Sequence, residues 1–174
     1  MEFENPQIYS QDLPDFTEAI PEKLEKNYFW VMFINRLSFV LVTIPAFLIS
    51  AYFIDFENKK IIFFSGSLLL LLICAFFLIS TKKAFNRKSY SIRHNDLIFR
   101  RGVLFNRITI VPFNRIQHIE LTRGPVENFF NLCSIKFFTA GGSQSDIIIP
   151  GLNTETANKI KSFIISKISV HEEY

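Results

Sequence analysis

The 174-residue sequence contains few of the residues from which catalytic and metal sites are built. It has two cysteines and three histidines, and His94, His118 and His171 are dispersed, with no pair at metal-ligand spacing on one element. Neither cysteine nor any serine lies in a nucleophile motif, and there is no glycine-rich loop of the kind that binds nucleotide phosphates. We therefore predict no catalytic, metal or cofactor site and a protein that is not an enzyme.

Disulfides and a cleavable signal peptide are not expected either. Cys74 lies in a long apolar run and Cys133 in the polar half of the chain, which is typical of a protein in a reducing compartment. Residues 1–27 hold seven acidic residues against Lys23 and Lys26, so they lack the basic start of a secretory signal. The last part of this acidic lead, residues 15–26, is compatible with a short amphipathic helix.

Two apolar runs, Leu37 to Ile54 and Ile61 to Ile79, are the main feature of the sequence. At about 1.5 Å per residue each run has roughly the length of the 30 Å hydrocarbon core of a bilayer. The second run has no polar face, whereas a core helix of a soluble protein shows an apolar stripe. The six residues Asp55 to Lys60 between the runs then require an antiparallel hairpin. Neither run contains Asp, Glu, Lys or His, so we expect no ion pathway.

Basic residues indicate the orientation of this hairpin. Five of them follow the second run closely: Lys82, Lys83, Arg87, Lys88 and Arg93. The positive-inside rule places this flank in the cytoplasm, and two spans return the N-terminus to the same side. We predict a multi-pass protein of the cytoplasmic membrane with both termini in the cytoplasm. Its parts are an acidic lead (1–27), a transmembrane region (28–81) and a cytoplasmic domain (82–174).

The C-terminal half alternates short β-like runs with turn residues. Period-two patterns predict six strands, at residues 90–93, 97–101, 107–111, 116–122, 134–139 and 146–149. One helical turn is predicted at 125–130, ending at Asn131 in the left-handed conformation. Apolar residues at three- and four-residue steps predict an amphipathic helix from about Thr154, capped by Asn153 or Thr154. Several short strands and one final helix describe a small barrel or sandwich closed by that helix.

Three motifs of this half carry a family resemblance. They are VPFNRIQHIELTRGPVENFFNLCSIKF at 111–137, TAGG at 139–142 and IPGL at 149–152. Together with the two preceding spans they resemble the bacterial pleckstrin-homology-like (PH-like), membrane-flanked family of the YdbS type. The resemblance implies an α+β membrane protein in which a transmembrane hairpin precedes a PH-like barrel or sandwich capped by a C-terminal helix. Arg115 and Gln117 match the family pattern without an assigned role, whereas Asn128 replaces an arginine of that pattern.

The strongest functional signal is positive charge next to the membrane. Residues 82–123 contain ten Lys or Arg against Asp96 and Glu120. The candidate membrane-surface or partner contacts are Lys82, Lys83, Arg87, Lys88, Arg100 and Arg101. Basic side chains near an anionic leaflet gain about 1 kcal/mol each, but the positive-inside rule by itself also demands basic residues after a second span.

Two functions remain open from the sequence. The preferred one is a non-enzymatic interaction module that binds copies of itself or a larger membrane protein with repeated PH-like domains. The family resemblance implies this accessory role, in some members with a link to envelope stress or antimicrobial-peptide resistance. The alternative is a sensor of anionic lipid headgroups in the bilayer. Nucleic-acid binding is not expected, because the charge belongs to a membrane flank.

Overall fold

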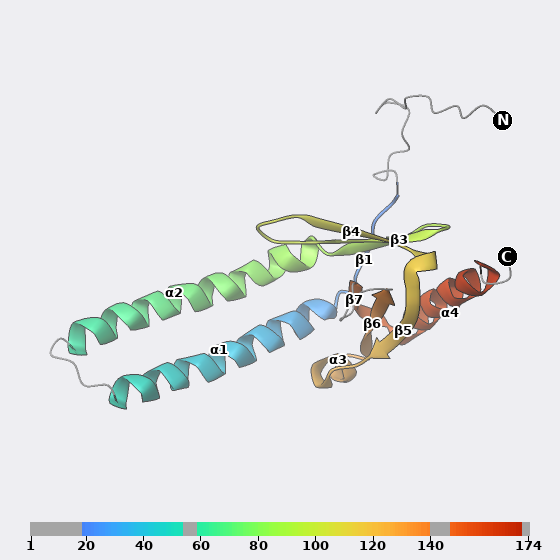
Figure 1. The fold of residues 1–174 in the computed structure, drawn as a ribbon. Coiled ribbons are helices and arrows are strands. Elements are labelled where there is room, and N and C mark those ends of the chain that lie inside the picture. The colour runs from blue at the N-terminus through green and yellow to red at the C-terminus, as the bar shows by residue number, and fades with distance from the viewer. Residues whose placement is uncertain (1–18, 54–58, 140–146, 172–174) are drawn as a thin grey trace, which may run out of the picture.

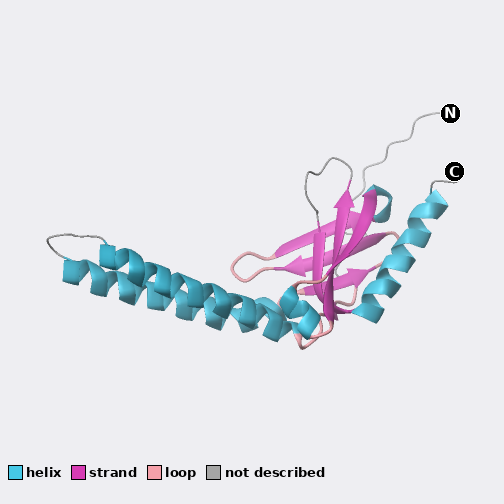
Figure 2. Ribbon diagram, turned by 90° about the horizontal axis from the view of Figure 1, so that it is seen from below, coloured by secondary structure: helices cyan, strands magenta, loops and turns pink. Residues whose placement is uncertain are grey.

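The computed structural model describes residues 19–53, 59–139 and 147–171 of the chain. They form a long helical hairpin and a β domain with a C-terminal helix beside it (Figure 1). The hairpin extends from one end of the β domain, and the C-terminal helix lies away from it (Figure 2). This architecture confirms the predicted α+β fold class.

The hairpin consists of α1 (Tyr28–Phe53) and α2 (Lys59–Asn86), which lie side by side (Figures 1 and 2). Within them, Tyr28–Ser50 and Phe63–Asn86 are long and apolar enough to cross a membrane. Few of their side chains are buried inside the protein. Exposed apolar helices of this length suit lipid as the surrounding medium. The predicted spans lie within α1 and α2, except that residues 54–58 are outside the described part of the chain.

Aromatic side chains fill the contact between the two helices. Phe39 packs on Phe77 and Phe47 packs on Phe63, with ring centroids 5.9 and 6.3 Å apart. Helix α1 continues past Pro45, whose ring cannot donate a backbone hydrogen bond. The helices therefore pair along their length through large rings.

The β domain contains two antiparallel sheets. The first has the strands β1 (Glu22–Lys23), β2 (Ser89–Ile92), β3 (Asp96–Arg101) and β4 (Arg107–Pro112), in that order. The second has β5 (Ile116–Thr122), β6 (Leu132–Thr139) and β7 (Ile147–Asn153). Three helical elements complete the domain: the 3-10 turn η3 (Phe113–Arg115), the short α3 (Pro125–Phe129) and α4 (Thr154–His171). All six predicted strands and both predicted helices of this half are present.

Two asparagines set helix ends as predicted. Asn131 follows α3 with a φ of 54°, a conformation that asparagine tolerates better than most residues. The side-chain oxygen of Asn153 accepts a hydrogen bond of 2.7 Å from the backbone N–H of Thr156 and so caps α4. The face of α4 that carries Ala157 and Ile164 is buried in the core.

The acidic lead contributes a strand that the sequence did not reveal. Strand β1 pairs with β2, with Glu22 opposite Tyr90 and Lys23 opposite Ser89. Residues 19–27 form no helix, so the amphipathic helix expected at 15–26 is wrong over its described part, and residues 15–18 lie outside it. Two residues are too few to show an alternating pattern, and only the partner strand makes them a strand.

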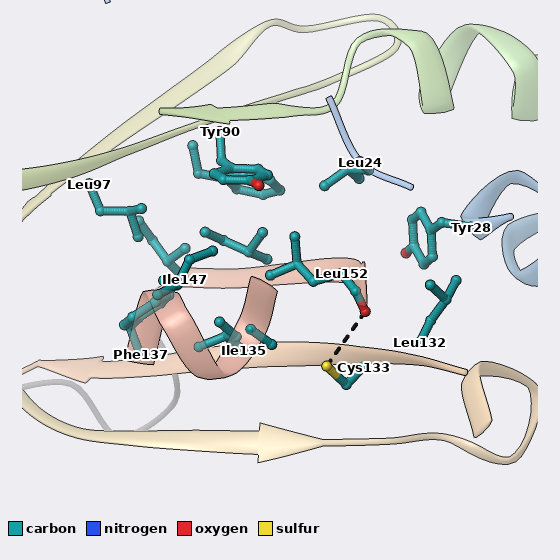
Figure 3. Packing of buried hydrophobic residues seen from close by; sticks show 14 of the residues in the cluster. Leu24, Tyr28, Tyr90, Leu97, Leu132, Cys133, Ile135, Phe137, Ile147 and Leu152 are labelled. Atoms are coloured by element: carbon teal, nitrogen blue, oxygen red, sulfur yellow. Dashed lines mark hydrogen bonds between the residues drawn. The ribbon is translucent and has the colours of Figure 1, made fainter. Parts of the chain in front are cut away.

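The hydrophobic core lies between the two sheets (Figure 3). Alternate residues of β3 and β6 supply much of it, such as Leu97 and Phe137, because side chains on a strand point to opposite faces in turn. Leu24, Tyr28 and Val31 enter the same core from the N-terminal side, and each is more than 90% buried. The start of the hairpin therefore completes the core of the domain that follows it.

Gly151 fixes this connection between hairpin and domain. Its φ is +66°, and an added Cβ would lie 2.2 Å from Cγ of Tyr28, so only glycine allows the ring to approach the backbone of β7. The backbone N–H of Glu25 donates to the carbonyl of Gly151 at 3.0 Å, and the side chain of Asn153 donates to the Glu25 carboxylate at 2.8 Å. The first turn of α1 is thus held on β7.

Candidate membrane-junction site

A cavity of about 440 Å³ lies where the hairpin meets the β domain. Four basic residues line it: Arg36 of α1, Lys88 after α2, Arg101 of β3 and Arg107 of β4. Its other walls are mainly apolar, from Met32, Ala84, Val103 and Phe105, together with Gly102. No acidic residue is among these described lining residues. We call this space the junction cavity; it combines positive charge with apolar walls at the end of the membrane helices.

Arg36 joins the two helices beside this cavity. Its Nη1 donates hydrogen bonds to the carbonyl of Phe77 (2.6 Å), the hydroxyl of Ser80 (2.8 Å) and the hydroxyl of Thr81 (3.0 Å), all on α2. Its guanidinium carbon also lies 4.6 Å from the ring centre of Phe77. The charge of Arg36 is therefore turned inward to α2, where polar partners offset its desolvation.

Lys88 is the most strongly perturbed cation of the site. It is half-buried, and its ammonium lies 3.4 Å from the Tyr28 hydroxyl and 5.1 Å from the centre of that ring. Burial, and then the positive charges of Arg36 and Arg101, lower the pKa of Lys88 from 10.5 to about 8. An anion in the junction cavity would relieve this repulsion.

A second cavity, of about 350 Å³, shares Lys88 and Arg101 with the first and continues towards β6 and β7. Glu127 of α3 lies on its wall. One oxygen of this carboxylate accepts from the Ser134 hydroxyl at 2.7 Å, and the other accepts from the backbone N–H of Gly124 at 2.9 Å. Glu127 thus holds the start of α3 against β6, with both oxygens in hydrogen bonds.

The loop between β3 and β4, residues 102–106, lines the junction cavity with Gly102, Val103 and Phe105. It is also hydrogen-bonded to the residue that follows α2. Gly102 has a φ of +140°, and an added Cβ would lie 1.8 Å from the carbonyl oxygen of Phe105. Arg87, just after α2, donates to the carbonyl of Val103 at 2.6 Å. The tip of the loop carries Leu104 and Phe105, which are 76% and 86% exposed.

The comparisons with known proteins agree with a membrane hairpin joined to a β domain. Residues 31–168 match the family described as Bacterial PH domain. The chain belongs to this family. The match includes most of the hairpin, strands β2 to β7 and most of α4, and it leaves out β1.

Two relatives of this bacterial PH-domain protein come from Bacillus subtilis (strain 168). The chain is 29% identical to the transmembrane protein YdbS over 75 residues, which are 43% of this chain and 45% of YdbS. It is 20% identical to the transmembrane protein YdbT over 142 residues, which are 80% of this chain and 29% of YdbT. The matches thus cover less than half the length of either relative. No solved structure matches the chain. The predicted YdbS-type resemblance is confirmed.

The predicted contact residues of this bacterial PH domain separate into three groups. Lys88 and Arg101 line the junction cavity, and Arg87 holds its loop. Lys82 and Lys83 are exposed on the last turns of α2. Arg100 lies next to Arg101 on β3 but donates to the Ser91 hydroxyl at 2.8 Å on the first sheet. Their role in binding stays a prediction.

Arg115 and Gln117 lie elsewhere. Arg115 is exposed on η3, which packs against α4, and Figure 1 shows this turn at the end of the domain away from the hairpin. Gln117 is exposed on β5, where the register with β6 shifts between Ile116 and His118. The structure does not bring either residue to the junction cavity.

Arg36 and Arg107 were not among the predicted contact residues. Arg36 directly precedes the first apolar run, and Arg107 is one of the ten basic residues between 82 and 123. Their proximity depends on how α1 and β4 pack, which leaves no local signal. The nearest hint in the sequence is their position, because Arg36 precedes an apolar run and Arg107 begins a predicted strand.

The described residues offer no group of three or more His, Cys, Asp or Glu suited to a metal ion. His118 stacks on Phe138 with ring centroids 4.1 Å apart. Cys133 is buried, and its thiol lies 3.5 Å from the carbonyl of Leu152 (Figure 3). Burial raises the pKa of this thiol, which disfavours the reactive thiolate.

Proposed function

We propose that this protein is a non-enzymatic, two-span membrane protein whose PH-like domain binds anionic phospholipid headgroups at the cytoplasmic face. Both termini lie in the cytoplasm, because the basic residues after α2 favour that side. The bilayer is its first partner. The hairpin supplies the anchor, and the junction cavity supplies the headgroup contact.

The observation that carries this proposal is the junction cavity with four basic and no acidic residues among its described lining, at the end of the membrane helices. Like charges in a partly desolvated space repel one another, and the pKa of Lys88 is lowered first by burial and then by the charges of Arg36 and Arg101. A phosphate group offers several acceptor oxygens and the opposite charge. Basic groups close to an anionic leaflet each contribute about 1 kcal/mol.

The test is lipid retention by the full-length protein purified in mild detergent. We expect it to retain phosphatidylglycerol in preference to phosphatidylcholine, and to lose this preference in the double variant Arg101→Gln, Arg107→Gln. The matched control is Lys159→Gln, Lys161→Gln, which removes the same charge from α4. Equal retention of both lipids by the parent protein, or an equal loss in the control variant, would contradict headgroup binding at this site.

A second function, binding of a protein partner, is supported by the edge of the first sheet. Strand β4 is the outermost strand, and Ile108 and Ile110 on it are 46% and 42% exposed. An exposed edge strand with apolar side chains is a template for pairing with another chain. The partner would be a larger membrane protein with PH-like domains, or a second copy, and the role would be that of an accessory subunit in envelope stress or antimicrobial-peptide resistance.

Photo-cross-linking in native membranes tests this second function. A cross-linking residue at Ile108 or Ile110 is expected to capture one discrete protein, whereas one at Phe163 on α4 captures none. A larger captured protein supports the accessory role, and a dimer of this chain supports self-association. Absence of any protein adduct at either isoleucine would overturn partner binding through β4.

A further inference from the structure

We infer that the loop at residues 102–106 is a second membrane contact, which inserts Leu104 and Phe105 into the cytoplasmic leaflet beside the hairpin. The inference rests on the proposed placement of the domain at the membrane face. It does not require that the junction cavity bind a headgroup. The loop contacts the boundary between the headgroups and the acyl chains of the bilayer that the hairpin crosses.

The position of the loop supports this contact. Figure 2 shows the connection between β3 and β4 projecting from the domain on the side of the hairpin. The Arg87 guanidinium holds this loop through the Val103 carbonyl at 2.6 Å and the Asn106 side chain at 3.4 Å. Arg87 comes directly after α2, so the apolar tip is fixed beside the end of a membrane helix. The loop is therefore continuous with the surface that already faces lipid.

The chemistry of the loop fits an interface between water and lipid. Leu104 and Phe105 expose 76% and 86% of their surface, although removal of such apolar side chains from water is favourable. Arg101 and Arg107 lie at the ends of the two strands that carry the loop. The two arginines then lie at the depth of the lipid phosphates, and the apolar tip lies among the first carbons of the acyl chains.

Another exposed aromatic residue lies near the hairpin. Phe129 of α3 is 81% exposed, and α3 packs against α1 near the start of the hairpin (Figure 1). By contrast, Phe163 of α4 is 39% exposed and packs edge-on against Phe113 at a centroid distance of 6.1 Å. Exposure of large rings is thus greater near the membrane helices than on α4.

The backbone of the loop presents its two side chains in a set shape. Gly102 has a positive φ, and an added Cβ at this position would clash with the Phe105 carbonyl oxygen. Strand pairing of Arg101 with Arg107 closes the loop at its base. A loop held in this way loses little conformational entropy on entering the leaflet, which favours insertion.

Fluorescence quenching of the full-length protein in proteoliposomes tests the inference. Trp30→Phe removes the one tryptophan of the chain, and Phe105→Trp then places a single reporter at the loop tip. We expect blue-shifted emission and loss of fluorescence with phospholipids brominated near the headgroup end of the acyl chains. The matched reporter Phe163→Trp in the same background should show no such loss. Equal, solvent-like emission from both reporters would overturn the insertion.

Separate variants keep the two membrane contacts distinguishable. Replacing Leu104 by Ser in the Phe105→Trp reporter should reduce quenching, because it removes half of the apolar tip. The same replacement with native Phe105 should leave the preference for phosphatidylglycerol unchanged, because Leu104 does not line the junction cavity. Arg101→Gln with Arg107→Gln should lower that preference and retain quenching. Equal retention of both lipids by the protein with native Arg101 and Arg107, together with intact quenching, would count against headgroup binding only. Absence of quenching with an intact preference would count against the loop only.

Discussion

Lys88 is the residue at which the two cavities meet, and charged or titratable groups face it from three elements. Arg36 and Tyr28 approach from α1, Arg101 from β3 and Glu127 from α3. Since its folded pKa of about 8 is below the ordinary 10.5, the unfolded chain binds more protons between these values. The unliganded protein therefore gains stability as the pH rises above about 8.

Lipid binding should have the opposite dependence on pH. An anionic headgroup favours protonated Lys88, so we expect the preference for phosphatidylglycerol to fall as the pH is raised from 7 to 9. Lys88→Arg keeps its charge throughout this range and should flatten the dependence. The measurement is lipid retention at each pH. The same decline in the arginine variant would show that another group is responsible.

Gly151 is the residue that decides whether α1 can lie on β7. Gly151→Ala forces a β-carbon into the Tyr28 ring at a positive φ, and we expect a loss of about 2 kcal/mol or more in unfolding free energy. Gly124→Ala is the matched control, because its φ is −75° and the nearest atom to an added Cβ is 3.7 Å away. Thermal unfolding in detergent distinguishes them. Equal melting temperatures would contradict the role of Gly151.

At the scale of elements, the hairpin is held together by rings along its length and by one polar contact near the domain. Arg36 of α1 donates to three groups of α2. Because a hydrogen bond within a membrane protein has few competing partners, its loss loosens the pair. Arg36 therefore adds polar contacts to the pairing of the helices near the β domain, where Phe29 also packs against Phe85.

Arg36→Leu should weaken the pairing of α1 with α2 by about 1 kcal/mol, since interhelical hydrogen bonds in membranes contribute roughly that much. Ser38→Ala is the control, because the Ser38 hydroxyl donates only to the Ile34 carbonyl of its own helix at 2.8 Å. Denaturation of the full-length protein in mixed micelles measures both. A stability of the Arg36 variant equal to that of the control would show that the rings alone hold the helices.

At the scale of the whole molecule, the hairpin and the domain form one folding unit. Leu24, Tyr28 and Val31 are buried in the domain core, although most of α1 and all of α2 lie between them and β2 in the chain. Strand β1 adds backbone pairing on the same side. Removal of everything before residue 82 therefore opens the core.

We expect the isolated segment 82–174 to lack a cooperative unfolding transition, because loss of one buried leucine alone costs about 2–5 kcal/mol. Joining residues 19–32 to residue 82 through a flexible linker should restore a cooperative transition. Near-ultraviolet circular dichroism during heating measures both. A sharp transition in the shorter segment would show that the domain is independent of the hairpin.

Much of the fold was predictable from the sequence, because its signals are local. Apolar length predicts the two membrane helices, period-two alternation predicts strands such as β3, and Asn131 and Asn153 mark helix ends. Strand β1 was missed because two residues have no period. The candidate site was predicted in part: Lys88 and Arg101 follow from charge near a span, while Arg36 and Arg107 depend on packing.

The sequence alone determined two apolar helices of membrane length and a half of short strands closed by a helix, since hydropathy and alternation are properties of neighbouring residues. The PH-like assignment came from the resemblance of its motifs to a known family. Only the tertiary structure decided that Leu24 and Tyr28 complete the core and that four cations surround one cavity. It also decided that Leu104 and Phe105 project beside α2. These features join residues far apart in the chain, and their proximity is set by close packing between elements rather than by the pattern of any one segment.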